Sequence, residues 1–147
     1  MRILFPIVFF SLLGSSTGFA AEKNLVAPLN DQSAIDGCSW SASSERMGKS
    51  YIFLAEYDLS RILMNIDGID VDLELSSRSG SIHQLGSVSR MVYQAKGIIV
   101  RSTYKTTWVC PKDDSSESCE VTRFNATYEV SKGARHQVVY ASGDVGC

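Results

Sequence analysis

The chain has 147 residues, with 14 basic and 16 acidic side chains, a net charge of -2 and four cysteines. This length leaves room for one domain, because single domains commonly contain about 100 to 150 residues. The near-balanced charge, with a pI of about 5.6, gives no basic footprint for nucleic acid. An apolar content of 44% excludes a disordered tail.

The N-terminus has the composition of a secretory signal peptide. Met1-Arg2 begins with a positive charge, Ile3 to Leu13 is almost wholly apolar, and small polar residues follow. The apolar run is much shorter than the ~20 residues that a membrane-spanning helix needs. We therefore expect a signal peptide at residues 1–20, cleavage after Ala20 and a periplasmic or secreted protein without a membrane span.

Residues 21–36 show no hydrophobic period, and we expect an extended leader there before a single β domain at residues 37–147. The strongest local signal in this domain is Asp67-Gly68, which is flanked by Arg61–Ile66 and Ile69–Leu75. An Asp-Gly pair between two alternating runs is typical of a β-hairpin. The second arm alternates apolar and acidic residues, which predicts one core face and one solvated face.

Strand-like runs make up the rest of the domain, with tight turns expected at Lys96-Gly97 and Lys132-Gly133. The other expected strands are Gly37–Ala42, Tyr51–Tyr57, Arg90–Ala95, Ile98–Val109, Glu120–Val130 and Arg135–Ala141. The two tryptophans and six tyrosines lie mainly inside such runs, which favours core packing over an aromatic binding surface. About eight short strands predict an all-β fold, a small antiparallel β-barrel or sandwich.

Four cysteines in an exported chain predict two disulfides. Cys110 and Cys119 flank a polar loop between two expected strands, which favours a bridge across the base of that loop. Cys38 and Cys147 then pair by elimination and join the start of the folded region to its last residue. Structural zinc sites use closely spaced cysteine pairs, which this chain lacks. We therefore expect two disulfides, no metal and no cofactor.

Few residues are candidates for catalysis. His83 and His136 are the only histidines, and neither belongs to a hydrolase or zinc-protease motif. The acidic residues of the hairpin are Asp67, Asp70, Asp72 and Glu74. Their alignment along one strand favours a solvated face over a calcium loop or a catalytic pair. We expect a non-catalytic domain that binds a protein or a cell-envelope component, with a secreted hydrolase using His136 as the enzymatic alternative.

Two segments, Ser79-Gly80-Ser81-Ile82-His83 and Tyr93-Gln94-Ala95-Lys96-Gly97-Ile98, resemble motifs of the periplasmic inhibitors of C-type lysozyme. The Ile82-His83 region stands where that family has a tyrosine. The resemblance implies an eight-stranded antiparallel barrel with a disulfide, in which Ser79 and Lys96 contact the catalytic carboxylates of a lysozyme. More broadly, the chain is similar to small uncharacterised bacterial exported proteins that end in Gly-x-x-Gly-Cys, a resemblance that implies no activity.

Overall fold

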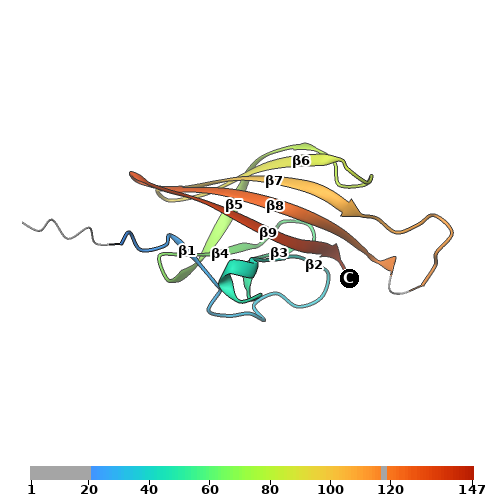
Figure 1. Ribbon diagram of the computed structural model, residues 1–147, viewed down its shortest axis with the longest axis horizontal. Helices are drawn as coiled ribbons and strands as arrows, with labels where there is room; N and C mark the ends of the chain where they lie inside the picture. Colours follow the sequence, from blue (N-terminus) through green and yellow to red (C-terminus); the bar gives the residue numbers. More distant parts are fainter. Residues whose placement is uncertain (1–20, 117–118) are drawn as a thin grey trace, which may run out of the picture.

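The computed structural model describes residues 21–116 and 119–147, which fold almost entirely into β-strands (Figure 1). The strands are β1 (Val26–Ala27), β2 (Ser39–Ser43), β3 (Tyr51–Glu56), β4 (Ile62–Ile66), β5 (Ile69–Gly80), β6 (Val88–Ala95), β7 (Ile98–Trp108), β8 (Val121–Lys132) and β9 (Arg135–Gly146), with a 3₁₀ turn, η1 (Glu45–Met47). Their order in the sheet is β1-β4-β3-β2-β9-β8-β7-β6-β5. No helix in these two ranges is long and apolar enough to cross a membrane.

A further pairing of β4 with β5 closes the sheet into an eight-stranded antiparallel barrel, to which β1 adds a short strand. The expected all-β fold is confirmed, and it is a barrel. Closure depends on the length of β5, because residues 69–73 pair with β4 whereas residues 74–80 pair with β6. A single long strand therefore connects the two halves of the barrel wall.

The expected Asp67-Gly68 hairpin is present. Asp67 and Gly68 have φ angles of 55° and 83°, and a two-residue turn that follows the strand twist needs positive φ at both positions. The expected core face of the second arm is only partly correct. Leu73 is buried, but Ile69 is 64% exposed because β6 does not extend beside the start of β5. Leu75 is also exposed, next to an irregularity in the β5–β6 pairing.

Aromatic rings fill the centre of the barrel. The fully buried aromatic residues are Trp40, Phe53, Tyr93, Tyr104, Phe124 and Tyr128. The ring centroids of Trp40 and Tyr104 lie 5.3 Å apart, as do those of Phe53 and Tyr128, within the range at which aromatic pairs attract. The expectation that most aromatic residues pack in the core or across strands holds for these residues, but three tyrosines are exposed. These exposed tyrosines are Tyr51, Tyr57 and Tyr140.

The segment before β2 packs against β3 and β4, where Leu25 and Val26 join the main core. Val26 in β1 pairs with Ile66 of β4, at the end of β4 that β3 leaves unpaired. Further along, Leu29 and Ile35 join the outward-facing side chains of β3 and β4 in a second buried hydrophobic cluster. The segment expected as an extended leader therefore covers apolar surface that the barrel wall would otherwise expose to water.

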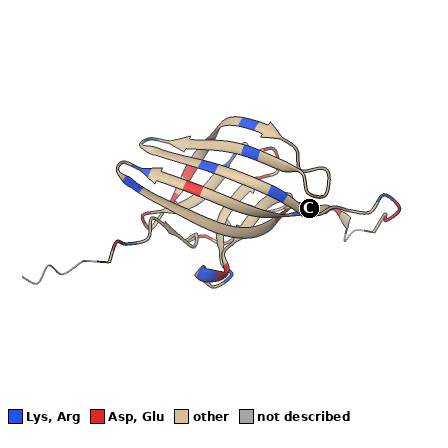
Figure 2. Ribbon diagram, turned by 45° about the horizontal axis from the view of Figure 1, so that its top comes forward, with Lys and Arg blue, Asp and Glu red and all other residues tan. Residues whose placement is uncertain are grey.

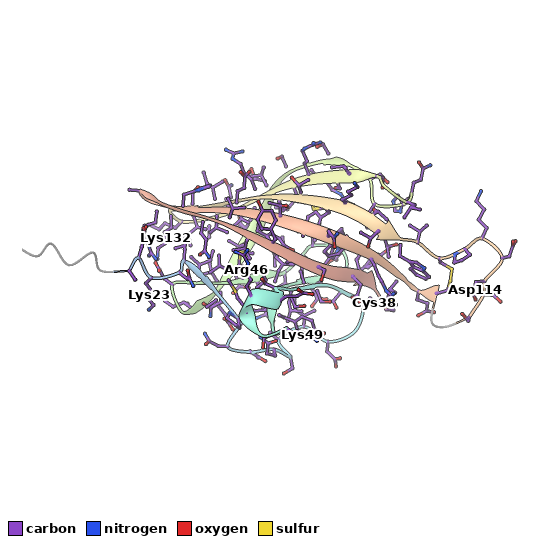
Figure 3. The ribbon with its side chains drawn as sticks, in the orientation of Figure 1. Lys23, Cys38, Arg46, Lys49, Asp114 and Lys132 are labelled. Atoms are coloured by element: carbon purple, nitrogen blue, oxygen red, sulfur yellow. A yellow bond between two sulfur atoms is a disulfide. The ribbon has the colours of Figure 1, made fainter. Side chains whose placement is uncertain are left out.

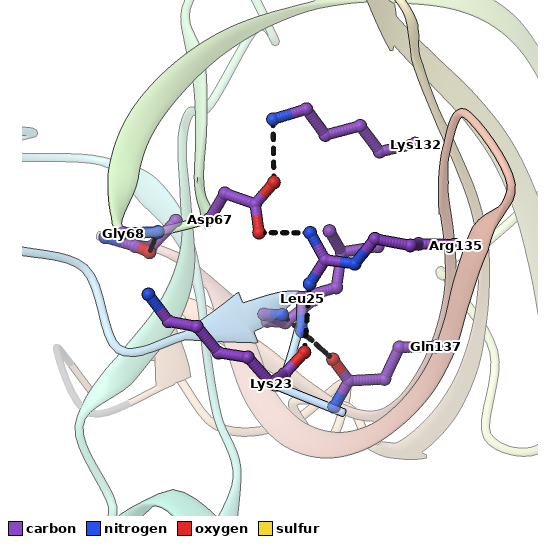
Figure 4. Close-up of polar contacts among 9 residues, drawn as sticks. Lys23, Leu25, Asp67, Gly68, Lys132, Arg135 and Gln137 are labelled. Carbon is purple, nitrogen blue, oxygen red and sulfur yellow. Dashed lines mark hydrogen bonds and ion pairs between the residues drawn. The ribbon is translucent and has the colours of Figure 1, made fainter. Parts of the chain in front are cut away.

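Ionic and hydrogen-bonded contacts close one end of the barrel (Figure 4). Asp67, in the β4–β5 turn, accepts a hydrogen bond from Lys132 Nζ at 2.7 Å and another from Arg135, beside the β8–β9 turn. Arg135 also donates to the carbonyl oxygen of Lys23. Gln137 Oε1 accepts two backbone hydrogen bonds from the start of β1, at 2.8 and 2.9 Å. Two turns and the start of the described chain are thus joined.

Both expected disulfides are present, Cys38–Cys147 and Cys110–Cys119. The first connects the residue before β2 to the residue after β9, and these two strands are neighbours in the barrel. The second closes the loop that carries Asp114 and projects from the end of the molecule opposite Lys132 (Figure 3). Two disulfides indicate an oxidising compartment outside the cytoplasm.

Candidate functional site

Ser79 and Lys96, the residues singled out by the lysozyme-inhibitor resemblance, are both exposed but far apart. Ser79 pairs with Arg90 near the start of β6, whereas Lys96 follows the end of that strand. A rise of about 3.3 Å per residue along β6 separates them by roughly 20 Å. Lys96 shares a recess with the carboxylates of Asp72 and Glu74. Contact of both Ser79 and Lys96 with one partner stays a prediction.

The two histidines lie at opposite ends of the barrel. His83 is in the loop between β5 and β6, and His136 is at the start of β9; both are exposed. A site built around one histidine would therefore have to work without the other. Among the residues that the structure describes, no three histidine, cysteine, aspartate or glutamate side chains come together as a metal site would require.

We expected all the acidic residues of the hairpin to face water, but not all of them do. Asp72 and Glu74 are exposed, but Asp70 accepts hydrogen bonds from the backbone N–H groups of residues 30 and 31 and from the Asn65 side chain. Partial burial would raise the pKa of Asp70, but these hydrogen bonds outweigh it and hold the pKa below its usual value. Asp67 holds the barrel end together. The partners of Asp67 and Asp70 all lie outside β5, so the alternation within that strand alone could not reveal these contacts.

A recess of about 680 Å³ lies on the outer face of β6–β9, with η1 at its edge. Two adjacent cross-strand rows form its floor. The first row is Arg90, Thr103, Thr127 and Tyr140, and the second is Val88, Lys105, Asn125 and Ser142. Short hydroxyl and amide side chains in the middle, with longer Arg90, Lys105 and Tyr140 around them, leave the hollow. Arg46, labelled in Figure 3, also lines it from η1.

Basic residues are spread over this face of the barrel (Figure 2). Outside the recess, two of them lie opposite an acidic residue on the neighbouring strand: Arg101 pairs in register with Glu129, and Arg123 pairs in register with Asp144. The guanidinium of Arg123 also lies over the Trp108 ring, 5.3 Å from its centroid. Opposite charges in such cross-strand positions stabilise a sheet. Arg101 and Arg123 therefore each have a carboxylate on the residue directly opposite.

The recess cations have no such neighbour. Arg90 lies opposite Ser79 and Thr103, and Lys105 lies opposite Val88 and Asn125. Arg90 has Lys105 and Arg101 as its two diagonal neighbours on β7, each about 7 to 8 Å away at the backbone, so that the charges repel. Glu45 is the acidic side chain among the lining residues, against three basic ones. None of Arg90, Lys105 and Arg46 forms an ion pair within the described parts of the chain, and the same holds for Arg101 and Arg123. What distinguishes Arg90 and Lys105 is that the residues opposite them are uncharged.

Tyr140 stands at the β9 end of the first row and is 67% exposed. The sequence analysis favoured core and cross-strand packing for the aromatic residues and did not single out Tyr140 as exposed. The alternation of side chains along a strand would have predicted this exposure. Val139 is buried, so the side chain of its neighbour Tyr140 must point to the opposite face. The grouping of Tyr140 with Arg90 and Lys105 could not be found in this way, since it depends on the register of four strands.

Comparison of this chain with protein-family models, with curated proteins and with solved structures found no match.

Proposed function

We propose that this barrel is a non-catalytic binding domain, periplasmic or secreted, that holds an anionic cell-envelope component in the recess over β6–β9. The observation that carries the proposal is the pair Arg90 and Lys105, two neighbouring cations whose cross-strand partners are all uncharged. Export is supported by the signal-peptide composition of residues 1–20 and by the two disulfides.

An anion placed between Arg90 and Lys105 would remove their mutual repulsion and form charge-assisted hydrogen bonds with both. Hydrogen bonds to charged groups contribute about 1.5 to 3 kcal/mol each. The recess, at about 680 Å³, is within the roughly 300 to 1,000 Å³ of small-molecule sites. The chain as a whole is slightly acidic, so local charge on this face determines the sign of what binds.

The test is isothermal titration of the purified exported protein with three anionic probes: oligogalacturonate, poly-L-glutamate and inorganic phosphate. We expect at least one probe to bind, with an affinity that falls as salt rises. The double variant Arg90→Ala/Lys105→Ala should weaken this binding about tenfold or more. The matched control, Arg101→Ala/Arg123→Ala, removes the same charge from the same face and should change it less than about twofold. Equal losses in both double variants, or no binding of any probe, would reject the proposal.

Inhibition of a C-type lysozyme is a second candidate, because the chain has the eight-stranded barrel with a disulfide that the resemblance implies. The spacing of Ser79 and Lys96 requires such a partner to contact both ends of β6. If this candidate is right, the purified protein slows the lysis of cell walls by a C-type lysozyme, and Lys96→Ala weakens the effect. An unchanged rate of lysis at micromolar protein would remove it.

A further inference from the structure

We infer that the ligand of the recess is an acidic oligosaccharide, with a sugar ring on Tyr140 and an acidic group between Arg90 and Lys105. This inference rests on the proposed function and names the class of ligand. It starts from the first cross-strand row, in which Arg90 and Tyr140 occupy the two ends. Three interstrand steps of about 4.8 Å separate them by roughly 14 Å, so one extended ligand can contact both residues.

Tyr140 supplies an aromatic surface where the barrel does not need one. Its side chain is 67% exposed at the recess wall, although aromatic side chains gain most from burial. An exposed ring beside polar groups suits a partner with one apolar face and many hydroxyls. A pyranose has both, because its axial C–H bonds form an apolar patch while its hydroxyl groups point outward.

The floor between Arg90 and Tyr140 carries the polar groups that such a ligand needs. They are the hydroxyls of Thr103, Thr127 and Ser142 and the amide of Asn125. Hydroxyl and amide groups can each donate and accept hydrogen bonds, as sugar hydroxyls also do. Asn125 and Ser142 are exposed, so their hydrogen-bonding capacity is accessible from the recess.

Other anions match fewer of these features. A free phosphate between Arg90 and Lys105 would leave Tyr140, roughly 14 Å away, without a role. A protein partner commonly buries about 800 Å² on each side around apolar or aromatic anchors, whereas this recess is floored by small polar side chains. The combination of two uncompensated cations, a polar floor and one exposed ring favours an acidic glycan.

The experiment compares four probes on the purified exported protein by isothermal titration: oligogalacturonate, uncharged maltohexaose, poly-L-glutamate and inorganic phosphate. Oligogalacturonate should bind most tightly, because it alone offers sugar rings and carboxylates together. Tyr140→Ala should weaken its binding roughly five- to tenfold, and Tyr140→Phe should retain it, since stacking needs the ring. The matched control is Tyr57→Ala, an exposed tyrosine that follows β3 and is not among the residues that line the recess; it should leave the affinity unchanged.

The outcomes separate this inference from the function on which it rests. If poly-L-glutamate or phosphate binds as tightly as oligogalacturonate, and Arg90 and Lys105 are required but Tyr140 is not, the recess binds anions and the glycan inference is wrong. Failure of oligogalacturonate to bind also overturns the inference. If no probe binds through Arg90 and Lys105, both proposals fall. Equal binding of maltohexaose and oligogalacturonate would show that the cations do not select the ligand.

Discussion

Three tyrosine hydroxyls lie inside the barrel, and they differ in their partners. Tyr93 donates to Met91 Sδ at 3.1 Å and accepts from Tyr104 Oη at 2.8 Å. Tyr128 Oη lies near Tyr104 Oη inside the barrel, but it forms no hydrogen bond of acceptable geometry with any of the described residues. Burial raises the pKa of all three phenols, so they stay neutral in the folded state. Because the unfolded chain can ionise them, the barrel should lose stability as the pH rises past the usual tyrosine pKa of about 10.

This difference predicts opposite effects of two similar substitutions. Tyr104→Phe removes the hydrogen bond to Tyr93 and should lower the free energy of unfolding by about 0.5 to 1.5 kcal/mol. Tyr128→Phe removes a buried hydroxyl that has no partner and should leave the stability unchanged or raise it by about 1 kcal/mol. Urea denaturation followed by fluorescence measures both values. A Tyr128→Phe variant as unstable as Tyr104→Phe would mean that this hydroxyl is satisfied in solution.

At the scale of elements, the β4–β5 and β8–β9 turns depend on one carboxylate. Asp67 receives hydrogen bonds from Lys132 and Arg135, and these two cations hold the pKa of Asp67 below its usual value near 3.8. A depressed pKa in the folded state contributes stability above the pKa of the unfolded chain. That contribution is lost as the pH falls through the lower, folded-state pKa.

We therefore expect Asp67→Asn to lower the melting temperature at pH 7, and the difference from the unchanged protein to shrink below about pH 3.8. Asparagine accepts the positive φ of this position, so that the substitution removes the charge and leaves the turn possible. Asp72→Asn is the matched control, because Asp72 belongs to the same hairpin and its ion pair with Arg61 is exposed. Equal melting curves for Asp67→Asn and the unchanged protein at pH 7 would contradict the prediction.

At the scale of the whole molecule, local patterns predicted the strands well, because alternation and tight turns depend only on residues that are adjacent in the sequence. The Asp67-Gly68 hairpin and both disulfides followed from such patterns and are confirmed. Those patterns favoured a barrel or a sandwich but did not decide between the two, because the choice depends on β5 pairing with β4 in its first half and with β6 in its second. No composition or period distinguishes those halves.

The candidate site could not be predicted from the sequence either, because it also depends on how the strands pair. Arg90, Lys105, Asn125 and Tyr140 come from four strands, and each is unexceptional in its own segment of the sequence. Only the register places them in neighbouring rows and shows which cations lack an acidic residue opposite. A site that consists of cross-strand neighbours becomes visible once the pairing of the strands is known.

The Cys38–Cys147 bridge turns the barrel into a covalent ring. The bridge encloses all eight barrel strands, and its two Cα atoms are 4.1 Å apart. A protease that cuts one turn between residues 38 and 147 would open the ring but release no fragment, since both pieces remain joined through the bridge. A cut in the loop between Cys110 and Cys119 would be held by two disulfides, because the Cys110–Cys119 bridge also joins the two new ends. Single nicks outside the cytoplasm would therefore leave every strand tethered to its neighbours and able to pair again.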